Sequence, residues 1–145
     1  MKRTDPPIVV SNTVQGTVET IWAAITQLKL MQHWYFENID AFEPVVGSRS
    51  RFPVQSEDRT FTHLWEVTAV KPLERISYGW QYEEYPGTSV VHFEIDAKVQ
   101  PATVRIITEV LEDFPEDIPE FRRESCQGGW EYFLGRLKSY LAQGE

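Results

Sequence analysis

Hydrophobic residues near the N-terminus first follow a strand pattern and then a helical one. Residues 8–14 are rich in β-branched side chains and predict a strand, which Gly16 ends. Thr17 is suited to cap a helix over residues 18–28, because its hydroxyl accepts a hydrogen bond from a backbone N–H of the first turn. A second short helix is expected at residues 29–36. One face of the first helix carries Val18, Ile21, Trp22, Ile25 and Leu28.

At the other end of the chain, residues 122–142 predict a long amphipathic helix. Hydrophobic side chains recur there at three- and four-residue steps, at Trp130, Phe133, Leu134, Leu137, Tyr140 and Leu141. The acidic loop before this helix contains Asp117 and Glu120, whose spacing predicts a capping box at the helix start.

Between the helices the hydrophobic pattern changes to alternation. Short turn signals separate the alternating segments, so consecutive strands are expected to pair antiparallel. Five strands are predicted, at residues 50–54, 61–70, 74–82, 89–99 and 103–111.

One face of this sheet is predicted to be aromatic and apolar, and the other mostly polar. A sheet of this kind needs a cover on its apolar face. The C-terminal helix is the expected cover, and the two short helices are expected to close one end. The inward set is Phe61, His63, Trp65, Val67, Ala69, Ile76, Tyr78, Trp80, Tyr82, Val91, Phe93, Ile95, Val104, Ile106, Thr108 and Val110.

Gly128 and Gly129 interrupt the predicted C-terminal helix. Each glycine costs a helix interior about 1 kcal/mol relative to alanine. Two explanations stay open at this point. The bare backbone either accommodates bulky aromatic neighbours or a kink, or it leaves room for a ligand between helix and sheet. Trp34, Trp65, Trp80 and Tyr82 are the expected neighbours in the first case.

Composition limits the classes of function. The chain has 145 residues, 41% of them hydrophobic, and is expected to form one domain over residues 1–145 with a substantial core. Its formal net charge is −8, which argues against nucleic acid and anionic membranes as partners. Cys126 is the only cysteine, so an internal disulfide is excluded. With no apolar stretch of secretory or membrane-spanning length, we expect a soluble, cytoplasmic protein.

The order of strand, two helices, antiparallel strands and long helix resembles the α+β helix-grip fold of the START domains and the birch-pollen allergen superfamily, also called SRPBCC. Within it, the chain is similar to the activator of heat-shock protein 90 ATPase homologues. Four stretches in the right order carry this resemblance: "VETIWAAIT" with "LMQHWYF", "VGSRSRFPV", "WEVTAVKPLERISYGW" and "GGWEYFLGRLKSYL".

Two positions depart from that family's usual pattern. Ser48 stands where a second glycine is common, and Trp65 stands where a small residue is usual. An inward tryptophan would shrink any cavity beside it. The chain is also too short to contain the large N-terminal domain of the eukaryotic co-chaperone, so we do not expect it to stimulate the chaperone's ATPase.

Candidate chemistry is sparse. His63 is the one histidine on the predicted inner face, where it could hydrogen-bond a ligand, act as a general base or be a hydrogen-bonded core residue. His33 and His92 are predicted to be solvated, and no histidine spacing suits a metal, so neither metal nor cofactor is expected. Glu109 is expected outside, near Arg105, unless a one-residue slip turns it inward. Cys126 is expected to be an inert, buried thiol.

Three functions remain open from the sequence. The first is binding of a small apolar or aromatic ligand between sheet and helix. The second is a cyclase-like or hydrolase-like enzyme using His63 or an inward Glu109, and the third is a protein-interaction or co-chaperone-like module. Leu64, Val70, Ile107 and Leu111 on the predicted outer face could mark a homodimer contact. Expected ligand-binding residues are Trp34, Phe36, His63, Trp65, Trp80, Tyr82, Gly129, Trp130 and Phe133.

Overall fold

The computed structural model describes residues 1–143. Three α-helices and six strands follow the predicted order, and a short 3₁₀ turn precedes the last helix. The elements are β1 (Ile8–Val14), α1 (Val18–Thr26), α2 (Leu28–Trp34), β2 (Arg49–Ser56), β3 (Arg59–Lys71), β4 (Arg75–Tyr82), β5 (Tyr85–Asp96), β6 (Ala102–Glu112), the 3₁₀ turn Pro119–Phe121 and α3 (Arg123–Gln143).

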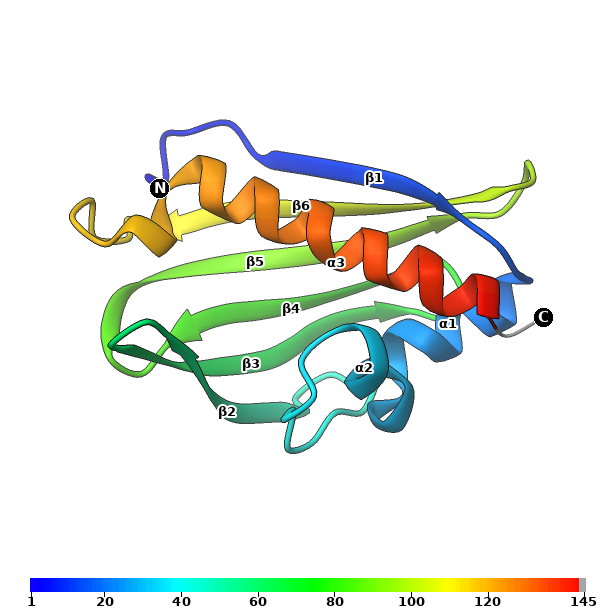
Figure 1. Ribbon diagram of the computed structural model, residues 1–145, viewed down its shortest axis with the longest axis horizontal. Coiled ribbons are helices and arrows are strands. Elements are labelled where there is room, and N and C mark those ends of the chain that lie inside the picture. Colours follow the sequence, from blue (N-terminus) through cyan, green and yellow to red (C-terminus); the bar gives the residue numbers. More distant parts are fainter. Residues whose placement is uncertain (144–145) are drawn as a thin grey trace.

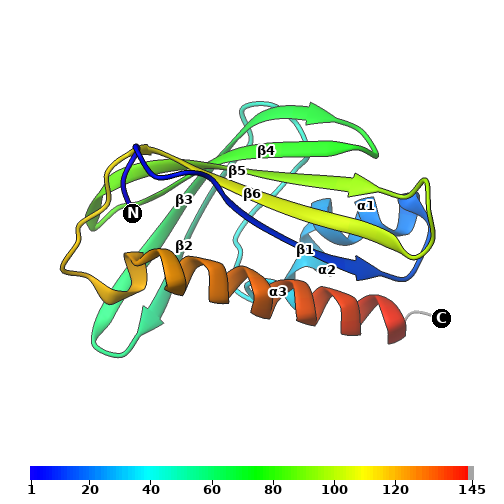
Figure 2. The same ribbon diagram turned by 90° about the horizontal axis from the view of Figure 1, so that it is seen from above.

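The six strands form one antiparallel sheet in the order β1-β6-β5-β4-β3-β2. Helix α3 lies across one face of the sheet, and α1 and α2 pack at one end (Figure 1). A view turned by 90° shows that the sheet is curved and that the β2–β3 hairpin bends toward the side of α3 (Figure 2). The predicted helix-grip fold is therefore confirmed. Within residues 1–143, no helix combines the length and hydropathy needed to cross a membrane.

The predicted inner face is buried along most of its length. Trp65, Tyr78, Phe93 and Ile106 are each at most 2% exposed, and no register slip turns Glu109 inward. The prediction is wrong at the end of β3, where the β3–β4 register shifts between Val67 and Ala69. The extra residue of such a bulge inverts the alternation beyond it. Ala69 is consequently exposed, and Val70 packs against the core.

Aromatic side chains fill the end of the core nearest α1 and α2. The Trp34 ring stacks on Tyr35 and its indole nitrogen donates to the Ala24 carbonyl oxygen at 2.8 Å. The hydroxyls of Tyr35 and Tyr78 are 2.9 Å apart. Trp65 packs beside both tyrosines. These contacts leave no free surface on Trp34 or Trp65, which are 0% and 2% exposed.

The helix ends differ in part from their predicted positions. Thr17 caps α1 as expected, accepting from the Thr20 N–H at 3.2 Å. The predicted capping box is wrong, because Glu120 lies in the 3₁₀ turn and α3 begins only at Arg123. The Glu120 carboxylate instead accepts hydrogen bonds from the β2–β3 hairpin. Pro119 at the first position of the turn favours this early, separate helical turn.

Gly87 is a position where only glycine fits the fold. Its φ is +114°, and a Cβ there would lie 2.4 Å from the Phe114 ring. We expect Gly87→Ala to lower the free energy of unfolding by at least about 2 kcal/mol, because backbone strain adds to a clash in a packed aromatic cluster. Gly47→Ala is the matched control, since Gly47 has φ +95° with no atom within 4 Å of its Cβ position. Urea denaturation of both variants measures the difference, and equal losses would show that the Phe114 clash costs nothing.

Candidate ligand cavity

A cavity of about 270 Å³ lies between the sheet and the N-terminal half of α3. It is close to the lower end of the size range of small-molecule sites, about 300–1,000 Å³, and most of its wall is apolar. The lining residues are Met1, Phe36, Val54, Ser56, Phe61, His63, Trp80, Tyr82, Ser89, Val91, Thr108, Phe114, Glu120, Phe121, Ser125, Cys126, Gly129, Trp130 and Phe133.

Most of the expected ligand-binding residues lie together in this wall. Seven of them line it: Phe36, His63, Trp80, Tyr82, Gly129, Trp130 and Phe133. Trp34 and Trp65 do not, because the aromatic packing near α1 and α2 buries them. An inward Trp65 thus fills the space beside it, as its size predicts, and the cavity opens nearer the β2–β3 hairpin. The buried indole N–H of Trp65 has no hydrogen-bond partner among the described residues.

Sequence reasoning missed a second group of wall residues. Phe61, Phe114 and Phe121 form a separate buried cluster at the hairpin end of the cavity. Phe61 follows the strand alternation and was predicted to face inward, but not to bind a ligand. Phe114 and Phe121 lie in the irregular segment before α3, where no periodicity identifies a buried face.

The two helix glycines have different surroundings. Gly129 lines the cavity and Gly128 is exposed, and neither has an atom within 4 Å of the position a Cβ would take. The explanation by close approach of an aromatic neighbour is therefore wrong. The backbone at Gly129 borders open space instead, whereas Gly128 faces outward.

His63 is a buried polar side chain of the wall with a ring nitrogen that a ligand could use. It is 5% exposed, and Nδ1 lies 2.9 Å from the Phe61 carbonyl oxygen. Because a carbonyl only accepts, Nδ1 carries the proton and Nε2 is left as an acceptor. Burial lowers the pKa of His63 to about 4, so the ring is neutral at physiological pH.

Two tryptophans of the wall have their indole N–H groups satisfied within the protein. Trp80 donates to the Tyr82 hydroxyl at 2.8 Å, and Trp130 donates to the Thr108 hydroxyl at 3.0 Å. The rings thus contribute apolar surface without an unpaired donor. Burial raises the pKa of the Cys126 thiol to about 11, which agrees with the expectation of an inert thiol.

One carboxylate stands at the edge of this apolar wall. The Glu120 side chain is 24% exposed, and its Oε2 accepts from Ser56 Oγ at 2.8 Å and from Arg59 Nη1 at 3.3 Å. Burial alone would favour protonation, but the hydrogen bonds from Ser56 and Arg59 together hold the pKa of Glu120 below its ordinary value. Glu120 is consequently ionised at neutral pH.

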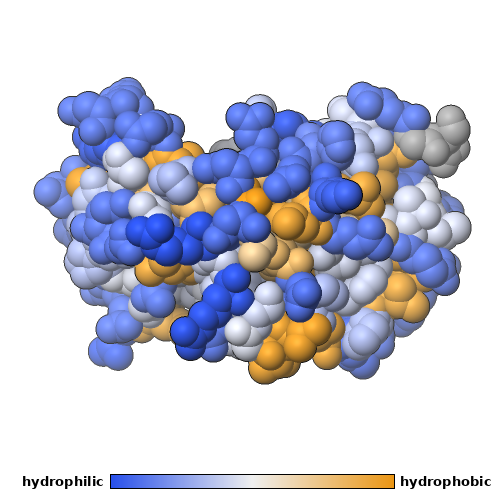
Figure 3. All heavy atoms as spheres, turned by 90° about the horizontal axis from the view of Figure 1, so that it is seen from below, coloured by the Kyte–Doolittle hydropathy of each residue, from blue (hydrophilic) through white to orange (hydrophobic). Residues whose placement is uncertain are grey.

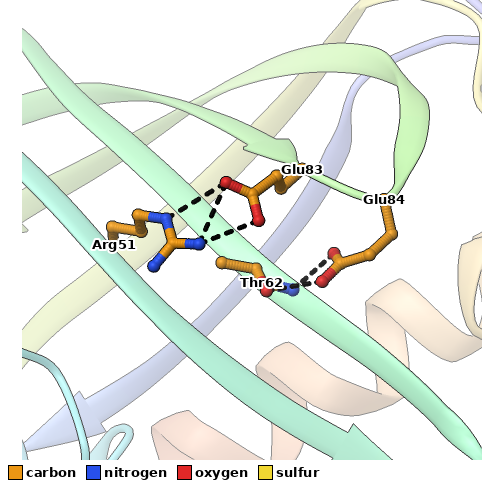
Figure 4. Close-up of polar contacts among 4 residues, drawn as sticks. All are labelled: Arg51, Thr62, Glu83 and Glu84. Atoms are coloured by element: carbon orange, nitrogen blue, oxygen red, sulfur yellow. Dashed lines mark hydrogen bonds and ion pairs between the residues drawn. The ribbon is translucent and has the colours of Figure 1, made fainter.

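Polar contacts fix the strand segment that carries His63. Glu84, in the β4–β5 turn, accepts from both the backbone N–H and the hydroxyl of Thr62 (Figure 4). Arg51 of β2 forms a bidentate pair with Glu83 of the same turn, its Nη2 lying 2.8 Å from Oε2 (Figure 4). Both partners of this pair are exposed, so solvent screens their attraction, and the pair links the β4–β5 turn to β2.

The remaining candidate groups lie away from the cavity. His92 is on the outer face, but it is less solvated than predicted, with its ring Nδ1 2.6 Å from Ser77 Oγ. Glu109 Oε2 lies 3.8 Å from His92 Nε2. Glu109 does not pair with Arg105, which pairs with Glu94 instead. No group of His, Cys, Asp or Glu within residues 1–143 is arranged to hold a metal ion.

The molecular surface on the side of β2 and α2 is mainly hydrophilic. Hydrophobic atoms gather in a band across the middle of this face, and an indentation separates a hydrophilic lobe from the rest (Figure 3). The loop between α2 and β2 contributes two exposed aliphatic residues, Val45 and Val46.

The buried His63 makes stability dependent on pH in a defined window. Below about pH 6.5 the unfolded chain takes up a proton at His63, whereas the folded protein does so only near pH 4. We therefore expect the free energy of unfolding to fall by about 3 kcal/mol from this group as the pH drops through that window. Urea denaturation at several pH values measures the slope.

The variant His63→Gln should flatten this pH dependence, because it removes the group whose pKa burial lowers. Part of the slope persists in His63→Gln because burial and Arg75 lower the pKa of His92 as well. A wild-type slope retained in full by His63→Gln would contradict the assignment.

Comparison with known proteins gives a family and several structural neighbours. A family model described as "Activator of Hsp90 ATPase homolog 1-like protein" matches residues 15–142. A search of curated proteins found no match. Protein MLL2253 from Mesorhizobium loti is 27% identical, with a TM-score of 0.75 over 97% of this chain and 99% of its own.

Two further neighbours share the fold at lower identity. The Aha1 dimer from Colwellia psychrerythraea is 18% identical, with a TM-score of 0.73 over 94% of this chain and 96% of its own. DynU16, a protein of the dynemicin biosynthetic locus, is 22% identical, with a TM-score of 0.76 over 97% of this chain and 49% of its own.

Proposed function

We propose that this chain, which belongs to the Activator of Hsp90 ATPase homolog 1-like family, binds a small apolar or aromatic ligand in the cavity beneath α3. The observation that carries the proposal is the apolar cavity of about 270 Å³ that the backbone of Gly129 lines. The Cβ position of this glycine has no atom within 4 Å, although the surrounding wall is aromatic and buried. A helix glycine that costs stability is understandable where a side chain would obstruct a ligand.

The wall offers apolar surface and one orienting acceptor. Trp80, Trp130 and Phe133 supply ring surface, and His63 Nε2 accepts a hydrogen bond from a ligand. DynU16 belongs to a biosynthetic locus, which fits a role with small molecules. The proposal places the protein in the cytoplasm, where a lone thiol such as that of Cys126 stays reduced.

Binding is preferred to catalysis because His63 Nδ1 is hydrogen-bonded to a backbone carbonyl, and no acid within residues 1–143 is hydrogen-bonded to this ring. Glu109, the acid considered from the sequence, accompanies His92 on the outer face. The enzyme alternative would require turnover that depends on His63, and the co-chaperone alternative would require co-purification with the chaperone.

Substitution of the adjacent glycines tests the cavity. Indole and 2-naphthol are the probes, and the melting temperature is measured as each is titrated. We expect both to raise the melting temperature of the wild-type protein and of Gly128→Leu, because ligand binding stabilises the folded state by mass action. In Gly129→Leu the new side chain occupies the cavity, and the shift should disappear.

The two leucine variants are matched in composition and in helix propensity. Leucine favours a helix over glycine by up to about 1 kcal/mol, so neither variant should be less stable than the wild type without ligand. The proposal fails if no probe shifts the wild-type melting temperature, or if Gly129→Leu retains the full shift.

We also propose that the protein forms a homodimer through the outer sheet face near β1, as the Colwellia neighbour is described as a dimer. Val9 is 55% exposed there and is paired with Ile107 of β6. We expect light scattering at about 100 µM to give the mass of two chains, and Val9→Lys to give that of one, because a charge at the contact is costly. Val99→Lys, in the exposed β5–β6 turn, is the control, and a wild-type monomer would contradict the proposal.

A further inference from the structure

Glu120 has one carboxylate oxygen whose hydrogen-bonding capacity is unused. Oε2 accepts from Ser56 and Arg59, whereas Oε1 is buried and has no partner among residues 1–143. A buried acceptor without a donor is unfavourable, and the penalty is larger for a charged group. Because Glu120 lines the cavity, a donor on a bound ligand is well placed to satisfy it.

Within the described wall of the cavity, the acidic group is the charged group that has a buried atom without a hydrogen-bond partner. Glu120 is the only acidic side chain in the lining, which contains no lysine or arginine side chain, and His63 is neutral. The one cationic group of a lining residue, the Met1 ammonium, donates to the Phe121 carbonyl oxygen at 3.0 Å. Arg59 donates to Oε2, the other carboxylate oxygen of Glu120. Aromatic ring faces attract cations as well.

From this arrangement we infer that the ligand is a protonated arylalkylamine, with its ring in the aromatic cavity and its ammonium group on Oε1 of Glu120. The inference rests on the proposed function and specifies the ligand class. The ammonium group would supply the donor that the buried Oε1 lacks, and the 24% exposure of the Glu120 side chain as a whole leaves water close to the ion pair. An aryl carboxylate of the same size would place its charge against Glu120 instead.

Three probes of similar size and different charge test this inference: 2-phenylethylamine, 2-phenylethanol and 3-phenylpropanoate. Isothermal titration calorimetry at pH 7.5 measures each dissociation constant. We expect the amine to bind at least tenfold more tightly than the alcohol, because a charge-assisted hydrogen bond is stronger than a neutral one, and the carboxylate to bind weakest.

Glu120→Gln should remove the advantage of the amine and leave alcohol binding within twofold. Its amide oxygen still accepts from Ser56 or Arg59, and unchanged alcohol binding shows that the variant is folded. Glu124→Gln is the matched control, since it removes the same charge from an exposed position at the start of α3 and should leave all three affinities unchanged.

The outcomes separate this inference from the proposed function. Equal affinities for amine and alcohol, or an amine preference that survives Glu120→Gln, would overturn the amine assignment. If the alcohol nevertheless binds and Gly129→Leu abolishes its binding, the apolar cavity stands. Failure of all three probes to bind would overturn both.

Discussion

The packing of aromatic rings on the inner face of the sheet determines which part of the core is densely packed and which part contains a cavity. At the α2 end, Tyr35 contacts Trp34, Trp65 and Trp130 at ring-centroid distances of 4.7, 5.3 and 6.0 Å. At the hairpin end Phe121 also contacts Phe61 and Phe114, at ring-centroid distances of 5.4 and 5.3 Å, but there the rings surround a cavity. Both ends belong to the same curved sheet and lie beneath the same helix.

The difference between the two ends follows from which elements cover them. Helix α2 and the residue after it bring Trp34 and Tyr35 onto the sheet, where their rings fill the space, and the next residue, Phe36, lines the cavity. Toward the hairpin the first half of α3 is the cover, and its residues facing the sheet include Cys126 and Gly129. Small side chains on the covering helix leave volume that larger ones would occupy.

The sequence was informative wherever periodicity decides the structure. Alternation identified the inward residues of β3 to β6, and seven of the nine expected ligand-binding residues line one cavity. Alternation fixes the face on which a ring lies, but not whether that ring meets other rings or open space. Trp65 and Trp80 are cross-strand partners on the same face, yet only Trp80 reaches the cavity.

Irregular segments account for what could not be predicted. The β3 bulge exchanges the sheet faces on which Ala69 and Val70 lie. It could not be predicted, because a single inserted residue has no distinctive composition. Glu120 had the spacing of a helix-capping residue, whereas Pro119 starts a separate 3₁₀ turn and sends the carboxylate to Ser56 and Arg59. These partners lie more than 60 residues away along the chain, so local sequence contains no sign of them.

The polar groups of the cavity are distributed unevenly, and this has a consequence for recognition. The indole N–H groups of Trp80 and Trp130 are used within the wall, whereas His63 Nε2 and Glu120 Oε1 have no hydrogen-bond partner among residues 1–143. Both of the latter atoms are acceptors. Only a donor on a ligand can satisfy these two atoms, whereas the hydroxyl of Tyr82, which accepts from Trp80, keeps its own hydrogen for a ligand acceptor. Under the proposed function, His63 and Glu120 would therefore discriminate among apolar molecules by the donors that these carry.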